Sequence, residues 1–442
     1  MTAAHDESGS YLTAHEHAAA MIPERSGPLG DVRIVDLTQA LAGPFCTMIL
    51  ADMGADVIKV EPPQGDTVRH IGPHTEADDE HFFGGYFASN NRNKRSIVLD
   101  LKEPADVEVF LRLVGTADVV VENYRAGVMD QLGLGYEVLR ERKPDLVYGA
   151  IRGFGDPRTG EGPYTYWPAY DIVAQSMSGL VSYTGTKDGV RVASGPSVGD
   201  LYPAAMMVSG ILAALHHARR SGQGQFVDVG MVDSLMALCE SMTWRYSYTG
   251  EIQAPRGSEH PSLCPFELYD TADGLVAIAA PGPRHWERLC RIIGREDMID
   301  HDRYKSSRRR VLHREEVREA ITAWTGKLTK AEVVDTLADK VPCGPVNDAT
   351  DLHRNEQVRA RKMLVAVDHP GSARPVITPN TPIRFAESPT GVYRPAPKLG
   401  EHTGEVIDEL DRLASPPGPT ADDPDRVSKP DMTTALEAKE IE

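Results

Sequence analysis

The sequence predicts an α/β fold in which a large domain with a parallel sheet carries a smaller α+β domain. Strand-like and helix-like segments alternate from residue 32 onward. A strand, a helix and a second strand within about thirty residues indicate a parallel pair joined by a right-handed crossover. The chain of 442 residues is 41% apolar and 25% charged, which is ordinary for a globular protein and long enough for two domains.

The large domain is expected to begin with a strand at 32–38, a helix at 44–53 that ends before Gly54, and a strand at 55–61. A helix at 104–114 and a strand at 118–122 follow, and then a helix at 136–143 and a strand at 145–151. A buried helix at 201–217, a strand at 225–229 and a helix at 232–242 complete this part. Sheets of this kind bind ligands in loops beyond the carboxyl ends of their strands. The loops in question are 38–44, 61–69 and 123–127.

The chain divides into five predicted regions. Further downstream, a strand is expected at 274–280, and helices are expected at 284–293, 314–325, 330–340 and 403–413. Residues 29–248 are predicted to form the first part of the large domain, which binds the ligand, and residues 249–365 the smaller domain. Residues 366–414 would return to the large domain. The polar, aperiodic segments 1–28 and 415–442 are predicted to be flexible tails.

The charge balance and the cysteines exclude several classes of protein. With 47 basic and 65 acidic side chains the net charge is −18, which argues against nucleic acid or an anionic membrane as a partner. Five scattered cysteines give neither a disulfide framework nor a zinc spacing, and His15 and His17 lack the rigid support of a metal site. The N-terminus has no signal-peptide pattern, and the apolar stretch 201–215 is too short to span a bilayer. We therefore expect a cytoplasmic protein without a metal.

Signatures of common cofactors and hydrolases are missing from the sequence. It contains no GxxxxGKS/T loop, no complete nicotinamide-binding glycine pattern, no GxSxG and no HExxH. Any chemistry must therefore use carboxylates, hydroxyls or amides, and no tightly bound cofactor is expected.

Asp200 is the side chain that this reasoning singles out. It follows Gly199 in the segment SGPSVGDLYP and directly precedes the predicted buried helix, with Pro203 in the first turn. One interpretation is purely structural, because Asp is a preferred N-cap residue and Pro is tolerated there. The other is catalytic. A helix N-terminus favours the ionised carboxylate, and an ionised carboxylate beside a flexible glycine can act as a nucleophile.

A series of segments spread over about residues 30 to 413 carries a further signal. They read RIVDLTQALAGPFCTMILADMGADVIKVEPPQGD (33–66), NKRSIVLDL (93–101), VVENYRAG (120–127), PAYDIVAQSMSGL (168–180), GD (199–200), GQGQFVDV (222–229), GSEHPSLCPFELYDTADG (257–274), CGPVND (343–348) and APKLGEHT (396–403). In this order and spacing they resemble the class III CoA-transferases, the CaiB/BaiF family.

The resemblance implies a Rossmann-like sheet, and an interlocked homodimer in which each chain threads through its partner. It also implies an enzyme that moves CoA from an acyl-CoA thioester to a free carboxylic acid. The family's nucleophile matches Asp200, which would attack the thioester to give an aspartyl-acyl anhydride and the CoA thiolate. The thiolate would return to form aspartyl-CoA, and the acceptor acid would then take over the CoA. Coenzyme A is thus expected as a substrate.

Other site residues are carried over by position from the same resemblance. Asp171 matches an acidic side chain near the active site of relatives, Gly199 serves as a hinge, and His260 lies in a loop that could close over the acyl group. The expected CoA-binding residues are Ala40, Leu41, Ala42, Leu99, Lys102, Asn123, Tyr124 and Arg125. Among these, Lys102 and Arg125 would supply cations for the phosphates.

Two alternative functions stay open at this point. The sister activity in the family is racemisation α to the thioester, and the racemases place a histidine where this chain has Tyr170. A phenol with a pKa of ~10 is a poor base at neutral pH, which favours transfer. The second alternative is a CoA-binding protein without catalysis. Leu41 and residues 258–261 differ from the pattern of the formyl-CoA:oxalate enzymes, and Pro62 stands where some relatives have an arginine. The acyl donor and the acceptor acid therefore stay open. Small dicarboxylates such as succinate are an example at the level of the family.

Overall fold

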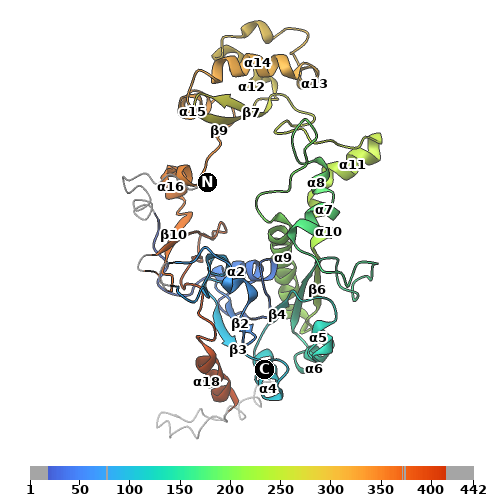
Figure 1. Cartoon of the computed structure of the whole chain (residues 1–442), viewed down its shortest axis with the longest axis vertical. Helices are drawn as coiled ribbons and strands as arrows, with labels where there is room; N and C mark the ends of the chain where they lie inside the picture. The colour runs from blue at the N-terminus through green and yellow to red at the C-terminus, as the bar shows by residue number, and fades with distance from the viewer. Residues whose placement is uncertain (1–17, 76–77, 371, 373–374, 415–442) are drawn as a thin grey trace, which may run out of the picture.

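The computed structural model of the chain describes residues 18–75, 78–370, 372 and 375–414. Most of both predicted tails, including His15 and His17, lies outside the described residues. A large α/β domain occupies the lower part of Figure 1, and a small domain lies at the top.

The large domain is built on a six-stranded sheet in which all neighbouring strands are parallel. The spatial order is β3-β2-β1-β4-β5-β6. The strands are β1 (Arg33–Asp36), β2 (Asp56–Glu61), β3 (Arg95–Val98), β4 (Val119–Glu122), β5 (Val147–Arg152) and β6 (Phe226–Gly230). This is the Rossmann order. It reverses between β1 and β4, so the ligand crevice of such a sheet lies beyond the carboxyl ends of these two strands.

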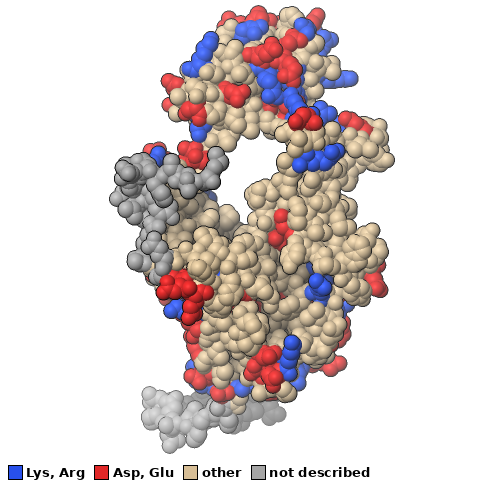
Figure 2. Space-filling model, in the orientation of Figure 1, with Lys and Arg blue, Asp and Glu red and all other residues tan. Residues whose placement is uncertain are grey.

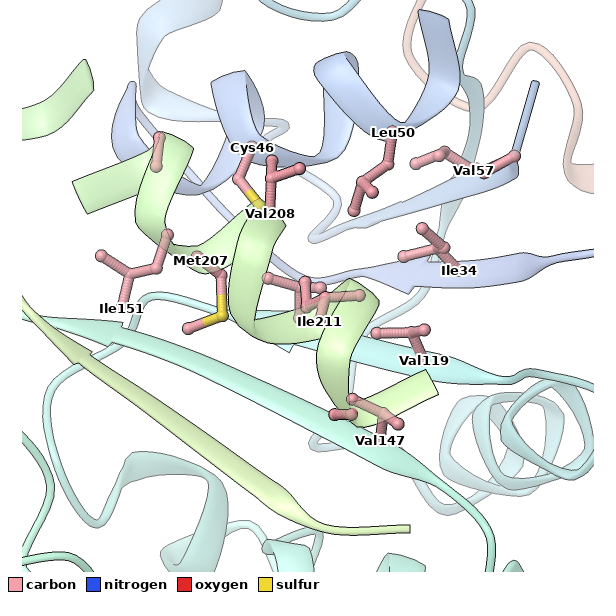
Figure 3. Packing of buried hydrophobic residues seen from close by; sticks show 14 of the residues in the cluster. Ile34, Cys46, Leu50, Val57, Val119, Val147, Ile151, Met207, Val208 and Ile211 are labelled. Carbon is pink, nitrogen blue, oxygen red and sulfur yellow. The ribbon is translucent and has the colours of Figure 1, made fainter. Parts of the chain in front are cut away.

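Helices cover both faces of the sheet, because its central strands are apolar on both sides. In β1, for example, Ile34 points into one core cluster and Val35 into the other. The first cluster packs the sheet against α2 (Ala42–Asp52) and α9 (Val198–Ser221), as Figure 3 shows. The second packs it against α4 (Pro104–Gly115), α6 (Tyr136–Arg142) and α18 (Thr403–Ala414).

Helix α9 is long and apolar enough to cross a membrane, the one such helix among the described residues. Its buried side chains, however, belong to the first core cluster, where Met207 and Ile211 pack against the sheet. We therefore interpret α9 as a core helix of the large domain.

Buried charges fix the loop between β1 and α2. The Asp36 carboxylate accepts hydrogen bonds from Lys94 Nζ at 2.9 Å, the Thr38 amide at 2.8 Å and Thr47 Oγ1 at 2.7 Å. Lys59 Nζ donates to the Thr38 carbonyl at 2.6 Å. Burial opposes ionisation of Asp36, but Lys94 and Lys59 outweigh it and lower its pKa to about 2. The loop is therefore held by charged contacts inside the core.

The small domain has its own antiparallel sheet and its own core. The sheet consists of β7 (Phe266–Thr271), β8 (Gly274–Ala279) and β9 (Cys343–Pro345). Its helices are α12 (Pro283–Ile292), α13 (Ser307–Leu312), α14 (Arg314–Thr325) and α15 (Lys330–Leu337). Trp286, Val317 and Leu337 are among the side chains that fill the core. Figure 2 shows an opening through the molecule between this domain and the large one.

The remaining elements are short and lie mostly in connecting segments. They are η2 (Thr67–His70), α3 (Gly85–Ala88), α5 (Val128–Gln131), α7 (Asp171–Met177), α8 (Leu180–Tyr183), α10 (Met231–Leu238), α11 (Glu240–Thr249), η3 (Glu296–Met298), α16 (Ala349–Arg354), α17 (Glu356–Ala360), β10 (Leu364–Val367) and β11 (Val376–Pro379).

Several elements differ from the prediction. The helix expected at 232–242 is two helices, α10 and α11, which meet at Cys239. Strand β3 was not expected, because Arg95 and Ser96 interrupt its apolar pattern; both are buried through contacts with acidic side chains. Strands β7, β9, β10 and β11 were also missed. Within the predicted tail, Ala19 exchanges backbone hydrogen bonds with β10, so residues near it are tied to the fold.

Replacing Lys94 with Met is expected to lower the free energy of unfolding by about 3–5 kcal/mol, because Asp36 would lose its closest buried counter-charge. The measurement is urea unfolding followed by circular dichroism. Lys102→Met is the control, since that side chain is exposed, and it should change stability by less than ~0.5 kcal/mol. Equal unfolding midpoints for the two variants would contradict this account of the loop.

Candidate active site

The three loops expected to form the binding site are joined to one another by hydrogen bonds. The Gln39 amide donates to Asn123 Oδ1 at 2.8 Å, and Asn123 Nδ2 donates back to the Gln39 carbonyl at 2.7 Å. The Ala40 amide donates to Asp66 Oδ1 at 3.2 Å. Ala40 has a φ of 63°, a strained value for a residue with a Cβ. The loops after β1, β2 and β4 therefore meet at the point where the strand order reverses.

The expected CoA-binding residues divide into two groups in the structure. Leu41, Ala42 and Leu99 are buried, so their side chains do not project into solvent. Lys102 and Arg125 are exposed, and neither forms an ion pair within the described chain. Both cations are therefore free to meet an anion.

Arg152 and Glu122 hold the loop after β4 through contacts with Tyr124. The sequence analysis did not single out either residue. Arg152 Nη2 contacts Glu122 Oε1 at 2.6 Å, and Arg152 also donates to the Tyr124 carbonyl. Glu122 accepts the Tyr124 amide at 2.7 Å. Burial raises the pKa of Glu122 to about 7 and that of the half-buried Tyr124 to about 12. The sequence does carry a signal for both residues, because each is a charged residue at the end of an apolar strand, Glu122 in β4 and Arg152 in β5.

Asp200 lies in the first turn of α9, and this corrects the prediction that it is the N-cap. The helix begins at Val198, and Ser197 is the N-cap residue. Within the described chain, no donor hydrogen-bonds the Asp200 carboxylate, although we expected backbone amides to hold it. The helix starts earlier than expected, because Val198 and Gly199, which were expected to lie in the preceding loop, are already helical. Asp200 is thus half-buried but free of hydrogen-bond partners in the described chain.

Asp171, and not Asp200, accepts a backbone amide from the start of α9. It is the first residue of α7, and its Oδ1 accepts the Gly199 amide at 2.7 Å. Gln175 Nε2 also donates to it, at 3.0 Å and 2.9 Å from the two oxygens. A Cβ on Gly199 would lie 2.7 Å from the Asp171 carbonyl oxygen. Glycine is therefore needed at 199 for close approach of the two helix N-termini.

The pair of carboxylates changes the expected charge state of Asp200. Burial, and then the negative charge of Asp171, raise the pKa of Asp200 to about 7. These two effects outweigh the helix N-terminus that was expected to keep the group ionised. At neutral pH the free protein therefore holds Asp200 as a mixture of acid and carboxylate.

Tyr86 is a further site residue that no pattern in the sequence indicated. It lies on α3, where it packs against the cluster that includes Phe83 and Phe87, beside Ala40. Burial, and then the charges of Asp200 and Asp171, raise the pKa of its phenol. Tyr86 is half-buried and lies close enough to both carboxylates to sense their charge.

Tyr170 and His260 have weaker links to this pair. Tyr170 is the N-cap residue of α7, and its side chain is 74% exposed. His260 Nδ1 accepts the Ser262 amide at 3.1 Å, and burial, then Arg314, lower its pKa. Within the described part of one chain, no hydrogen bond or ion pair joins His260 to the carboxylate pair. No group of three metal-ligating side chains occurs among the described residues.

The fold is an α/β fold on a Rossmann-type sheet, and these contacts bring a pair of carboxylates together at the starts of α7 and α9. The chain belongs to CoA-transferase family III, whose profile matches residues 29–403. The matched range includes the whole sheet, the carboxylate pair and the small domain.

Two relatives with a named activity are CoA-transferases. The chain is 45% identical to a succinyl-CoA:mesaconate CoA-transferase of Haloarcula hispanica, over 87% of this chain and 96% of that protein. It is 39% identical to a succinate–glutarate CoA-transferase of Agrobacterium fabrum, over 89% and 98%. A crystal structure of a CaiB/BaiF family protein from Brucella suis matches with a TM-score of 0.77 and 31% identity, over 87% of this chain and all of that one. The protein is therefore a CoA-transferase of this family.

Gly199→Ala is expected to lower the free energy of unfolding by about 1–3 kcal/mol and to reduce activity, because the new methyl group must push α9 away from Asp171. Gly195→Ala is the matched control, since a Cβ there meets no atom within 4 Å. Thermal unfolding and the specific activity of both variants provide the comparison. If both variants behave alike, the close approach at Gly199 is not the constraint described here.

Proposed function

We propose that this protein transfers CoA between short dicarboxylic acids through covalent intermediates on Asp200. The observation that carries the proposal is the Asp200 carboxylate itself. It is half-buried, it has no hydrogen-bond donor in the described chain, and it lies beside a second carboxylate. A carboxylate that no donor stabilises is more nucleophilic than a solvated one.

In the first half-reaction, an Asp200 oxygen attacks the thioester carbon of the donor. The C–S bond breaks as the C–O bond forms, which gives a mixed anhydride and the CoA thiolate. The thiolate then attacks the aspartyl carbonyl carbon and expels the donor as a free carboxylate. Asp200 is left as a thioester with CoA, and no proton or water is consumed.

The second half-reaction reverses these steps with the acceptor acid. The acceptor carboxylate attacks the aspartyl thioester and releases the CoA thiolate, which then attacks the acyl carbon of the new anhydride. The acceptor leaves as an acyl-CoA, and Asp200 returns as a carboxylate. Both anhydrides and the thioester are sensitive to water, so the half-buried position of Asp200 favours transfer over hydrolysis.

Asp171 supports the first attack through its charge. While Asp200 is ionised, two negative groups lie side by side, and burial adds to the cost. When the Asp200 oxygen is acylated, that residue becomes neutral and the new negative charge lies on the CoA sulfur. The repulsion is thereby relieved as the covalent bond forms.

For CoA, we propose the crevice beyond β1 and β4. The backbone of Ala40–Ala42, which lies near the strained turn, would line the thioester region. Lys102 and Arg125 would meet phosphate oxygens, because they are exposed cations without ion pairs in the described chain. Leu99, Asn123 and Tyr124 would shape the same crevice mainly by fixing the backbone of the loops around it.

The choice of acids follows from the relatives. Those at 45% and 39% identity are named for succinyl-CoA with mesaconate and for succinate with glutarate. We therefore propose that this chain uses dicarboxylic acids of that size as donor and acceptor, in the cytoplasm.

A homodimer is the proposed assembly, with the two chains interlocked. Large apolar side chains are exposed on α11 and the segment after it, such as Tyr248 at 84% and Ile252 at 82%. Trp244 on the same helix is also exposed. Figure 2 shows mostly uncharged surface along one wall of the opening between the domains. A second chain passing through this opening would cover such a surface.

Asp200→Asn is expected to lower CoA transfer at least about 10⁴-fold, because a carboxamide cannot form the anhydride. Asp335→Asn, which changes an exposed carboxylate on α15, serves as the control and should keep wild-type activity. In the wild type, hydroxylamine added during turnover should convert Asp200 to a hydroxamate that peptide mass spectrometry detects. Transfer at the wild-type rate by the Asn variant would refute the proposal.

The pH dependence of kcat/KM follows from the raised pKa of Asp200. Because the nucleophile must be ionised, kcat/KM should rise with pH through a midpoint near 7 and fall about tenfold per unit well below it. A carboxylate with the usual pKa of 3.8 would instead give a flat profile from pH 5 to 8. A flat profile would therefore contradict the charge state assigned to Asp200.

A further inference from the structure

Gln175 connects the carboxylate pair to the loop that precedes α9. It lies one turn after Asp171 on α7, and its side chain is fully buried. Its Nε2 contacts both Asp171 oxygens, at 3.0 Å and 2.9 Å, while its Oε1 accepts the Ser194 amide at 2.8 Å. A buried amide with all these contacts links two segments that lie nineteen residues apart in the sequence.

The partners fix which way this amide points. The backbone N–H of Ser194 can only donate, so the oxygen of Gln175 must face it. The NH₂ group then faces Asp171, which also accepts the Gly199 amide. The Asp171 carboxylate therefore accepts hydrogen bonds from two groups, the Gln175 amide and the Gly199 amide, and such bonds are strongest when the acceptor is charged.

We propose that Gln175 is a positioning residue for CoA transfer, which keeps Asp171 oriented and negatively charged beside the nucleophile. The inference rests on the proposed function of Asp200. Asp171 in turn sets the electrostatic environment of Asp200, as the second cause of its raised pKa after burial. Gln175 thus acts on the nucleophile through Asp171, without touching substrate.

Few other charges compete for this role. From α9, Asp200 faces Asp171, and Tyr86 faces the pair from α3. Tyr183 of α8 and Asp233 of α10, the other helices packed against α7, are directed to different neighbours. Within the described residues, no cation contributes to the charge state of Asp200. The donors on Asp171 are therefore the main control over how many negative charges the site carries.

The test compares Gln175→Leu with Gln175→Glu in the full-length enzyme, with the pH profile of kcat/KM as readout. The Leu variant removes the Gln175 donor and leaves only the Gly199 amide on Asp171, so the negative charge beside Asp200 is no longer held in place; the midpoint should move to lower pH by roughly 0.5 unit or more. The Glu variant adds a third carboxylate, so its midpoint should move to higher pH. Both should lose activity at pH 8, by about 10- to 100-fold.

Controls separate this role from a merely structural one. Ser176→Ala changes the next residue on α7, which is exposed, and it should keep the wild-type midpoint and rate. Thermal unfolding of each variant shows whether it is folded. Slower variants with an unchanged midpoint, or midpoints that move in the same direction, would overturn the inference about Gln175. The proposed function fails separately, through full activity of Asp200→Asn.

Discussion

The close approach of two helix N-termini, at Gly199 and Asp171, is the constraint on which the site depends. It puts the Gly199 amide on one carboxylate and leaves the neighbouring carboxylate of Asp200 without a donor in the described chain. Two like charges repel each other, so something must hold them together. The packing of α9 between α2 and the sheet does this, because its buried side chains anchor the helix along most of its length.

The proposed mechanism gives two identical functional groups different roles. Asp171 accepts hydrogen bonds from Gln175 and Gly199, whereas Asp200 accepts none in the described chain. We propose that this difference in environment, not in residue type, makes Asp171 a fixed negative charge and Asp200 the nucleophile, as in other enzymes with paired carboxylates. The buried charges beneath the neighbouring loop, Asp36 and Lys94 among them, hold the backbone that we propose binds CoA.

The sequence predicted the central sheet well, because strands such as β1 and β2 are apolar on both faces and alternate with helices. It did not predict β3, whose Arg95 is buried through ion pairs with acids on other elements, Asp56 of β2 and Glu409 of α18. Resemblance pointed to Asp200 as the expected nucleophile, and a local argument about its helix predicted an ionised carboxylate, whereas burial and Asp171 raise its pKa. The deciding neighbour, Asp171, lies in a different helix. Tyr86 carried no signal, since only the folded chain places it beside the pair.

Oxygen exchange tests the central claim most directly. The acceptor acid is supplied with ¹⁸O in its carboxylate, in unlabelled water, and the released donor acid is analysed by mass spectrometry over many turnovers. If Asp200 forms the anhydrides, the donor acid released in the first turnover takes its oxygen from Asp200 and is unlabelled, while one acceptor oxygen stays on Asp200. As the Asp200 carboxylate becomes labelled over the next turnovers, released donor acid approaches one ¹⁸O per molecule. Label already present in the donor acid of the first turnover would indicate a direct anhydride between donor and acceptor. Donor acid without label, at full transfer of CoA, would contradict covalent catalysis by this side chain.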